Sequence, residues 1–142
     1  MKKILVFVCM VLFLGSFVSA EYAQAARFVN NGNGTVTDTQ TGLMWADHDN
    51  GSNINWPNAK SYCEGYSGGG KSGWREPTMD ELQQLYNSGA YGNVIKRTGV
   101  YVWSSERHGS LFGSFAFDAG GWLWGPYVQD RYHRALPVRS GE

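Results

Sequence analysis

The residues best suited to bind a ligand gather in the last third of the chain. Tryptophan and tyrosine rings can stack on the C–H faces of sugars, and arginine can hold a sulfate or carboxylate through two parallel hydrogen bonds. We therefore predict a ligand-binding surface there, made of Glu106, Arg107, His108, Trp122, Trp124, Tyr127, Gln129, Arg131, Tyr132 and His133, with Arg134 beside them. The alternative is that Trp122 and Trp124 fill the core of a small domain.

Catalytic patterns are weak in comparison. The three histidines lie far apart without metal-ligand spacing, and the chain contains neither a Gly-x-Ser-x-Gly elbow nor a phosphate-binding loop. A Cys63 nucleophile with His108 or His133 as its base is conceivable, but Cys63 stands at the core spacing of a helix, which favours a buried, inert thiol. We expect no enzyme and no cofactor.

A calcium site is also disfavoured. Asp47, Asp49 and Gly51 resemble part of an EF-hand loop, but the glycine falls one step early and Asn58 stands where a glutamate should close the loop. We interpret this stretch as a solvated polar loop and predict no metal.

Local patterns predict the elements that hold these residues. Strands at 27–29 and 35–38 are joined by a turn rich in Asn and Gly, and a third strand follows at 43–45. A helix over 56–66 has Asn55 as its N-cap, and a second helix begins with a capping box from Thr78 to Glu81 and ends at Gly89.

The C-terminal half returns to strands. We predict them at 101–105, 114–117, 121–124 and 134–139, with Trp122 and Trp124 on one side of their strand. Pro137 indicates an edge or a bulge in the last of these. The tryptophans expected to pack in the core are Trp45, Trp56, Trp74 and Trp103.

The first twenty residues have the form of a signal peptide. A basic start with Lys2 and Lys3 precedes an apolar run and a small-residue end at Ala20, although cleavage as late as Ala26 also fits. A membrane anchor is the competing reading, but Gly15 and Ser16 interrupt a run that is short for a span. Removing the signal leaves ten basic against twelve acidic residues, so we expect no nucleic-acid partner.

Residues 27–140 form one predicted domain, and their pattern resembles the Lcl C-terminal domain family, which is named for a bacterial collagen-like adhesin. The resemblance is carried by Phe28, Asn33 to Asp38, Thr41 to Trp45, Trp56, Ala59, Tyr62, Cys63, Trp74, Arg75, Pro77, Thr78, Glu81, Leu82, Trp103 to Ser105, Val138 and Arg139. It implies an α+β, C-type-lectin-like fold, in which two helices flank a small twisted antiparallel sheet and long loops present a binding surface.

The resemblance also implies a role outside the cytoplasm. We expect an exported domain, periplasmic, secreted or on the cell surface, that binds a glycan or another exported macromolecule. The alternative is a protein-interaction module of the cell envelope whose partner docks on the same aromatic surface.

Two positions depart from the family pattern. Many relatives carry a cysteine after the final Val-Arg that is able to pair with the cysteine of the first helix, whereas this chain has Ser140. Cys63 is then left without that partner. Glu76 stands where relatives commonly carry leucine, so we expect the approach to the second helix to be more exposed.

Overall fold

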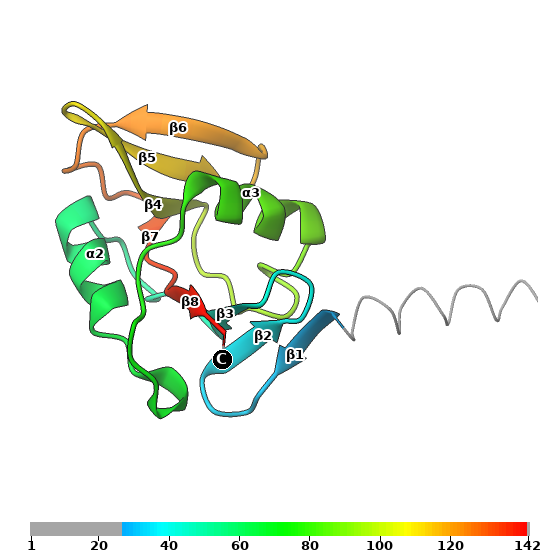
Figure 1. Cartoon of the computed structure of the whole chain (residues 1–142). Coiled ribbons are helices and arrows are strands. Elements are labelled where there is room, and N and C mark those ends of the chain that lie inside the picture. The colour runs from blue at the N-terminus through cyan, green and yellow to red at the C-terminus, as the bar shows by residue number, and fades with distance from the viewer. Residues whose placement is uncertain (1–26, 142) are drawn as a thin grey trace, which may run out of the picture.

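The computed structural model describes residues 27–141, in which two α-helices and a short 3₁₀ turn accompany eight strands (Figure 1). The predicted signal peptide, including its latest cleavage point, lies outside the described residues. The strands form two four-stranded sheets rather than the expected single small sheet. The α+β class is therefore confirmed, and the prediction of one antiparallel sheet is wrong.

The first sheet contains the predicted N-terminal meander. Its order is β1-β2-β3-β8 and all of its pairs are antiparallel. The strands are β1 (Phe28–Asn30), β2 (Thr35–Asp38), β3 (Leu43–Ala46) and β8 (Val138–Ser140). Local turns specify the first three strands, whereas the fourth arrives from the far end of the chain.

The second sheet has the order β6-β5-β4-β7. Its strands are β4 (Tyr101–His108), β5 (Leu111–Ala116), β6 (Gly121–Gly125) and β7 (His133–Arg134). The pairs along β6-β5-β4 are antiparallel, but β7 runs parallel to β4. The predicted strand 134–139 is thus two strands, because the buried residues between β7 and β8 carry the chain from one sheet to the other.

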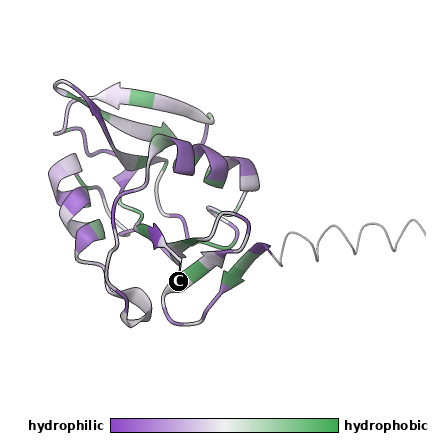
Figure 2. Cartoon of the chain, in the orientation of Figure 1, coloured by the Kyte–Doolittle hydropathy of each residue, from purple (hydrophilic) through white to green (hydrophobic). Residues whose placement is uncertain are grey.

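Both helices begin where the sequence predicts, but the first one ends at Glu64 rather than at the predicted Tyr66. In α2 (Trp56–Glu64), the Asn55 side chain accepts a hydrogen bond from the backbone of Asn58. In α3 (Met79–Ser88), Thr78 and Glu81 form the complete capping box, and Gly89 ends the helix with a left-handed φ of 72°. Hydrophilic and hydrophobic residues alternate along both helices, as expected of helices that cover a core on one side (Figure 2).

Two apolar clusters lie on opposite faces of the second sheet. The larger one joins α3 to both sheets and includes Leu82, Leu85, Val102 and Phe115. The smaller one joins α2 to the other face and consists of Trp56, Ala59, Cys63, Trp103, Phe112 and Ala135. The four tryptophans predicted for the core are all buried, at exposed fractions of 9% or less.

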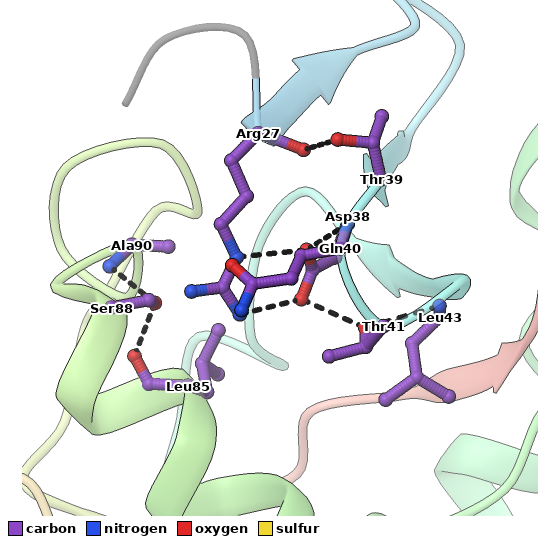
Figure 3. Close-up of polar contacts among 9 residues, drawn as sticks. All are labelled: Arg27, Asp38, Thr39, Gln40, Thr41, Leu43, Leu85, Ser88 and Ala90. Carbon is purple, nitrogen blue, oxygen red and sulfur yellow. Dashed lines mark hydrogen bonds and ion pairs between the residues drawn. The ribbon is translucent and has the colours of Figure 1, made fainter. Parts of the chain in front are cut away.

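A partly buried ion pair fixes the start of the domain. Arg27 donates two hydrogen bonds to Asp38, of 2.9 and 3.0 Å, and Thr41 and the backbone of Gln40 donate to the same carboxylate (Figure 3). Burial acts to raise the pKa of Asp38, but these hydrogen bonds outweigh it and hold the pKa below its ordinary value. The carboxylate is therefore charged and fully partnered in the fold.

Glu76 departs from expectation, because it is buried rather than exposed. Its exposed fraction is 3%, and neither carboxyl oxygen has a hydrogen-bond partner. The segment around it is tied down on both sides, since Arg75 exchanges two backbone hydrogen bonds with Val138 and Pro77 accepts one from Ser105. Burial raises the pKa of Glu76 to about 9, so the side chain is neutral at physiological pH.

Candidate functional site

One part of the predicted surface is formed by the hairpin of β5 and β6, at the end of the molecule where these strands project (Figure 1). Trp122 and Trp124 of β6 lie opposite Phe115 and Gly113 of β5, on the same side of the sheet. On that side, Phe115 packs against Tyr86 of α3 at 5.5 Å between ring centroids. Trp122 is 49% exposed, so it does not fill the core. Trp124 is half-buried.

His108 and Leu111 complete this side of the hairpin. The His108 ring lies edge-on against Trp124, at 4.3 Å between centroids. Leu111, the register partner of His108, is 43% exposed. We call His108, Leu111, Trp122 and Trp124 the hairpin face.

The loop from β6 to β7 forms a second exposed surface, on the side of the sheet that α2 covers. Tyr127, Val128 and Tyr132 are 49%, 58% and 48% exposed. Tyr127 is attached to the core at two points, because its ring lies 6.1 Å from that of Phe112 and its carbonyl accepts a hydrogen bond from the backbone of Trp56. We call Tyr127, Val128, Arg131 and Tyr132 the loop face.

Tyr132 adopts an unusual backbone conformation for a residue with a side chain. Its φ is 63°, and it is the only described residue other than glycine with a positive φ. Three hydrogen bonds hold it there: its N–H donates to the Asn53 side chain, and its carbonyl accepts from Val100 and Tyr101. Such a conformation costs about 1–2 kcal/mol, and strained residues of this kind concentrate at functional sites.

The exposed arginines lie next to aromatic rings on this side. The Arg131 guanidinium is 5.1 Å from the centroid of Tyr132 and donates a hydrogen bond to its hydroxyl, and Arg107 is 4.9 Å from the centroid of Phe112. Within residues 27–141, neither arginine forms an ion pair. Both guanidinium groups are therefore available to an anionic ligand.

The remaining predicted residues support these surfaces in different ways. Gln129 is exposed in the loop, where its backbone N–H donates to Pro126. Glu106 accepts a hydrogen bond from the backbone of Met79, which caps the first turn of α3. Since that carboxylate is occupied, Glu106 has a role in the fold.

His133 and Arg134 lie beneath the loop rather than on it. His133 is 1% exposed and stacks on Trp103 at 4.3 Å between centroids, while its ring nitrogens lie within hydrogen-bond distance of the Arg131 carbonyl and the Ser114 hydroxyl. Burial lowers the pKa of His133, so its ring is neutral. Arg134 is buried and donates to Asn53 and to Thr98.

Three exposed apolar residues of this region were not predicted from the sequence. Leu111 lies outside the predicted strand 114–117, and Leu123 and Val128 are aliphatic residues without the ring chemistry by which the surface was predicted. Leu123 is 41% exposed, on the side of β6 opposite Trp122. The correct register of β5 would have identified Leu111, because it places that residue on the same side as Phe115.

The candidate calcium loop has a structural role instead. Asp49 is 2% exposed, and its carboxylate accepts hydrogen bonds from Tyr91, from the backbone of Gly51 and from the backbone and hydroxyl of Thr98. Asp49 is thus a buried anchor and not part of a solvated loop. In the part of the chain that the structure describes, no three His, Cys, Asp or Glu side chains come together as a metal site.

Cys63 lies inside the smaller cluster and is a free, buried cysteine. Burial raises the pKa of its thiol above the ordinary range, so the nucleophilic thiolate is strongly disfavoured. This is the environment of a packing residue.

The sequence matches one known family of protein domains. The model of the Lcl C-terminal domain matches residues 34–139, which is most of the chain. This chain belongs to the Lcl C-terminal domain family. No curated protein matches the sequence. The matched range of the Lcl C-terminal domain includes the hairpin face and the loop face. Within the described residues, neither helix is long and apolar enough to cross a membrane.

Proposed function

We propose that this protein is an exported, non-catalytic binding domain that recognises an anionic glycan through the hairpin face and the loop face. Membership in the Lcl C-terminal domain family supports a binding role outside the cytoplasm in general terms. A C-type-lectin-like arrangement, with two helices supporting strands and long presenting loops, is the fold that we propose for it. The periplasm, the cell surface and the medium all fit this role.

One observation carries the glycan proposal: three aromatic rings at this end of the molecule remain about half exposed, and two arginines without an ion pair among residues 27–141 lie beside rings on the α2 side of the sheet. Trp122, Tyr127 and Tyr132 each expose close to half of their surface. Aromatic surface that stays in water adds no hydrophobic stabilisation to the fold, so a binding role accounts for it better than packing does. Aromatic rings next to guanidinium groups match a sulfated or carboxylated sugar.

The experiment is a heparin-binding measurement with paired variants. Trp122→Ala combined with Arg131→Ala should weaken binding about tenfold or more and leave the thermal midpoint near that of the wild type, because both side chains are exposed. Val29→Ala is the matched control, since Val29 is equally exposed on β1, in the other sheet. Heparin binding that is unchanged in the double variant would contradict the assignment of these faces.

An edge strand supports a second candidate function, the recognition of an extended protein segment. Strand β6 is the outer strand of its sheet, with Trp122 exposed on one side and Leu123 on the other. A partner segment could add to this edge through backbone hydrogen bonds while the two side chains supply specificity. This reading is preferred if exported proteins bind and soluble sugars, heparin included, never compete.

A further inference from the structure

A polar groove lies at the opposite end of the molecule from the β5–β6 hairpin. A hollow of about 680 Å³ is lined by Asn33, Ser61, Tyr62, Tyr66, Ser67 and the glycines of η1 (Gly68–Gly70). A second hollow of about 550 Å³ shares Asn33 with it and continues over the Thr35 and Thr37 side of β2. Figure 1 shows the loop after α2 lying beside the turn between β1 and β2.

Close backbone packing builds the first hollow. The N–H of Gly69 donates to the Asn33 carbonyl, and the Tyr66 hydroxyl donates to the Gly34 carbonyl at 2.6 Å. A Cβ atom on Gly68 would lie 2.4 Å from the Tyr66 ring, so only glycine allows this approach. The walls are therefore fixed before any ligand arrives, which lowers the entropic cost of binding.

The chemistry of the first hollow is neutral. Its lining contains amide, hydroxyl and phenol groups and the backbone of glycines, without a charged side chain. The Asn33 side-chain oxygen accepts from Thr35, whereas its amide nitrogen donates to no described residue. The hydroxyl of the half-buried Tyr62 likewise has no partner among residues 27–141. These groups can donate to and accept from hydroxyl groups of a ligand.

The second hollow continues the row of amide and hydroxyl groups along the sheet, and two charged residues, Asp38 and Lys71, also line it. Asn31 donates to the hydroxyls of both Thr35 and Thr37, at 2.9 and 3.0 Å, which fixes the orientation of these side chains. The result is an ordered row of amide and hydroxyl groups that leads away from Asn33. Such a row fits a ligand with repeated hydroxyl groups.

We propose that this groove is a second binding site, for a neutral saccharide, and that it is separate from the hairpin and loop faces. The volume of each hollow falls within the usual range of small-ligand sites. Tyr62 and Tyr66 offer rings to the C–H faces of a sugar, and the amide and hydroxyl groups satisfy its hydroxyls. The uncharged lining of the first hollow distinguishes its ligand from the anionic one.

The test is a titration of ¹⁵N-labelled protein with the neutral trisaccharides cellotriose and chitotriose. Amide shifts should change in a saturable manner at the turn between β1 and β2 and over 61–70, and not at the hairpin or loop face. Ser61→Trp, which fills the hollow from an exposed position on α2, should abolish the changes. Tyr62→Phe, which removes only the unpartnered hydroxyl, should weaken binding about two- to tenfold.

Asn58→Trp is the matched control, because it adds the same ring to an exposed position of α2 outside the hollow and should bind like the wild type. The proposal is overturned if neither sugar produces saturable changes, if the changes persist in Ser61→Trp, or if they map to the hairpin or loop face. A failed heparin experiment leaves this proposal standing, since the two sites share no residue.

Discussion

The two ends of this small domain present opposite kinds of surface. At one end, strands and a long loop carry half-exposed rings and unpaired arginines. At the other, a row of glycines closely approaches a turn, and backbone and tyrosine rings line an open groove whose first hollow is uncharged. The first surface is built by side chains that project from a scaffold, and the second by the lack of side chains at three successive positions. We infer from this contrast that one sheet-and-helix core can support two recognition chemistries.

The largest effect is expected from breaking the ion pair that anchors the first sheet, next to the groove. Asp38→Ala should lower the free energy of unfolding by about 3–5 kcal/mol, because it leaves the Arg27 guanidinium without its partner. Urea unfolding monitored by tryptophan fluorescence measures this loss. If the two ends form one cooperative unit, heparin and saccharide binding will disappear at the same urea concentration. Separate midpoints would contradict that.

A second substitution should stabilise the fold without touching either surface. Glu76→Leu, the residue implied by the family pattern, should raise the free energy of unfolding at pH 7 by about 1–3 kcal/mol, since it removes a buried carboxyl group that has no partner. Binding at both ends should remain as in the wild type. A lower stability of this variant would show that the carboxyl group has a favourable interaction in the fold.

The same residue predicts the direction of a pH effect. The pKa of Glu76 is raised to about 9 in the fold, so the folded state holds a proton that the unfolded state loses near its ordinary value. This contribution to stability is complete below the unfolded pKa and declines as the pH rises to about 9. Urea midpoints of the wild type should fall between pH 5 and 9 relative to those of Glu76→Gln, and parallel curves would refute the assignment.

A smaller effect separates the two surfaces. Tyr132→Gly relieves the positive φ, so stability should change by less than about 1 kcal/mol, while heparin binding should weaken about three- to tenfold through loss of the ring. Saccharide shifts at the groove should not change. Calorimetry measures the heparin affinity of this variant, and the NMR titration measures its saccharide affinity. Equal losses of the two affinities would contradict the existence of two separate sites.

The smallest effect concerns salt. Raising the ionic strength from about 0.05 to 0.3 M should weaken heparin binding several-fold, because exposed arginines act through a screened attraction. Saccharide affinity at the neutral groove should stay within about twofold. If ionic strength also changed the saccharide affinity, binding at the groove would depend on charge and not on hydroxyl chemistry alone.

Local signals in the sequence predicted much of the fold. The N-terminal hairpin, the Asn55 cap and the Thr78–Glu81 capping box depend on residues a few positions apart, and each is confirmed. The placement of Trp45 and Trp103 in the core follows from their size and from the small number of apolar residues available. Helix caps and turns are reliable because their partners are close in the sequence.

Features that depend on residues far apart in the chain could not be predicted from the sequence. The division of 134–139 between two sheets requires knowing that β7 pairs with β4 and β8 with β3, across intervals that no local pattern records. Burial of Glu76 has the same origin, because it follows from backbone pairing of Arg75 with Val138. The groove was not predicted, because the Gly68–Gly70 sequence indicates only the end of a helix. The walls of the groove also come from segments that are separate in the sequence.

The path of the last residues has a consequence for the order of assembly. Because β7 completes one sheet and β8 the other, neither sheet is whole until residues 133–140 have been synthesised. Pairings over such long intervals also slow the search for the native arrangement. We therefore expect both sheets of the nascent chain to stay open until residues 138–140 are available for pairing, so that the domain folds as a late, single event.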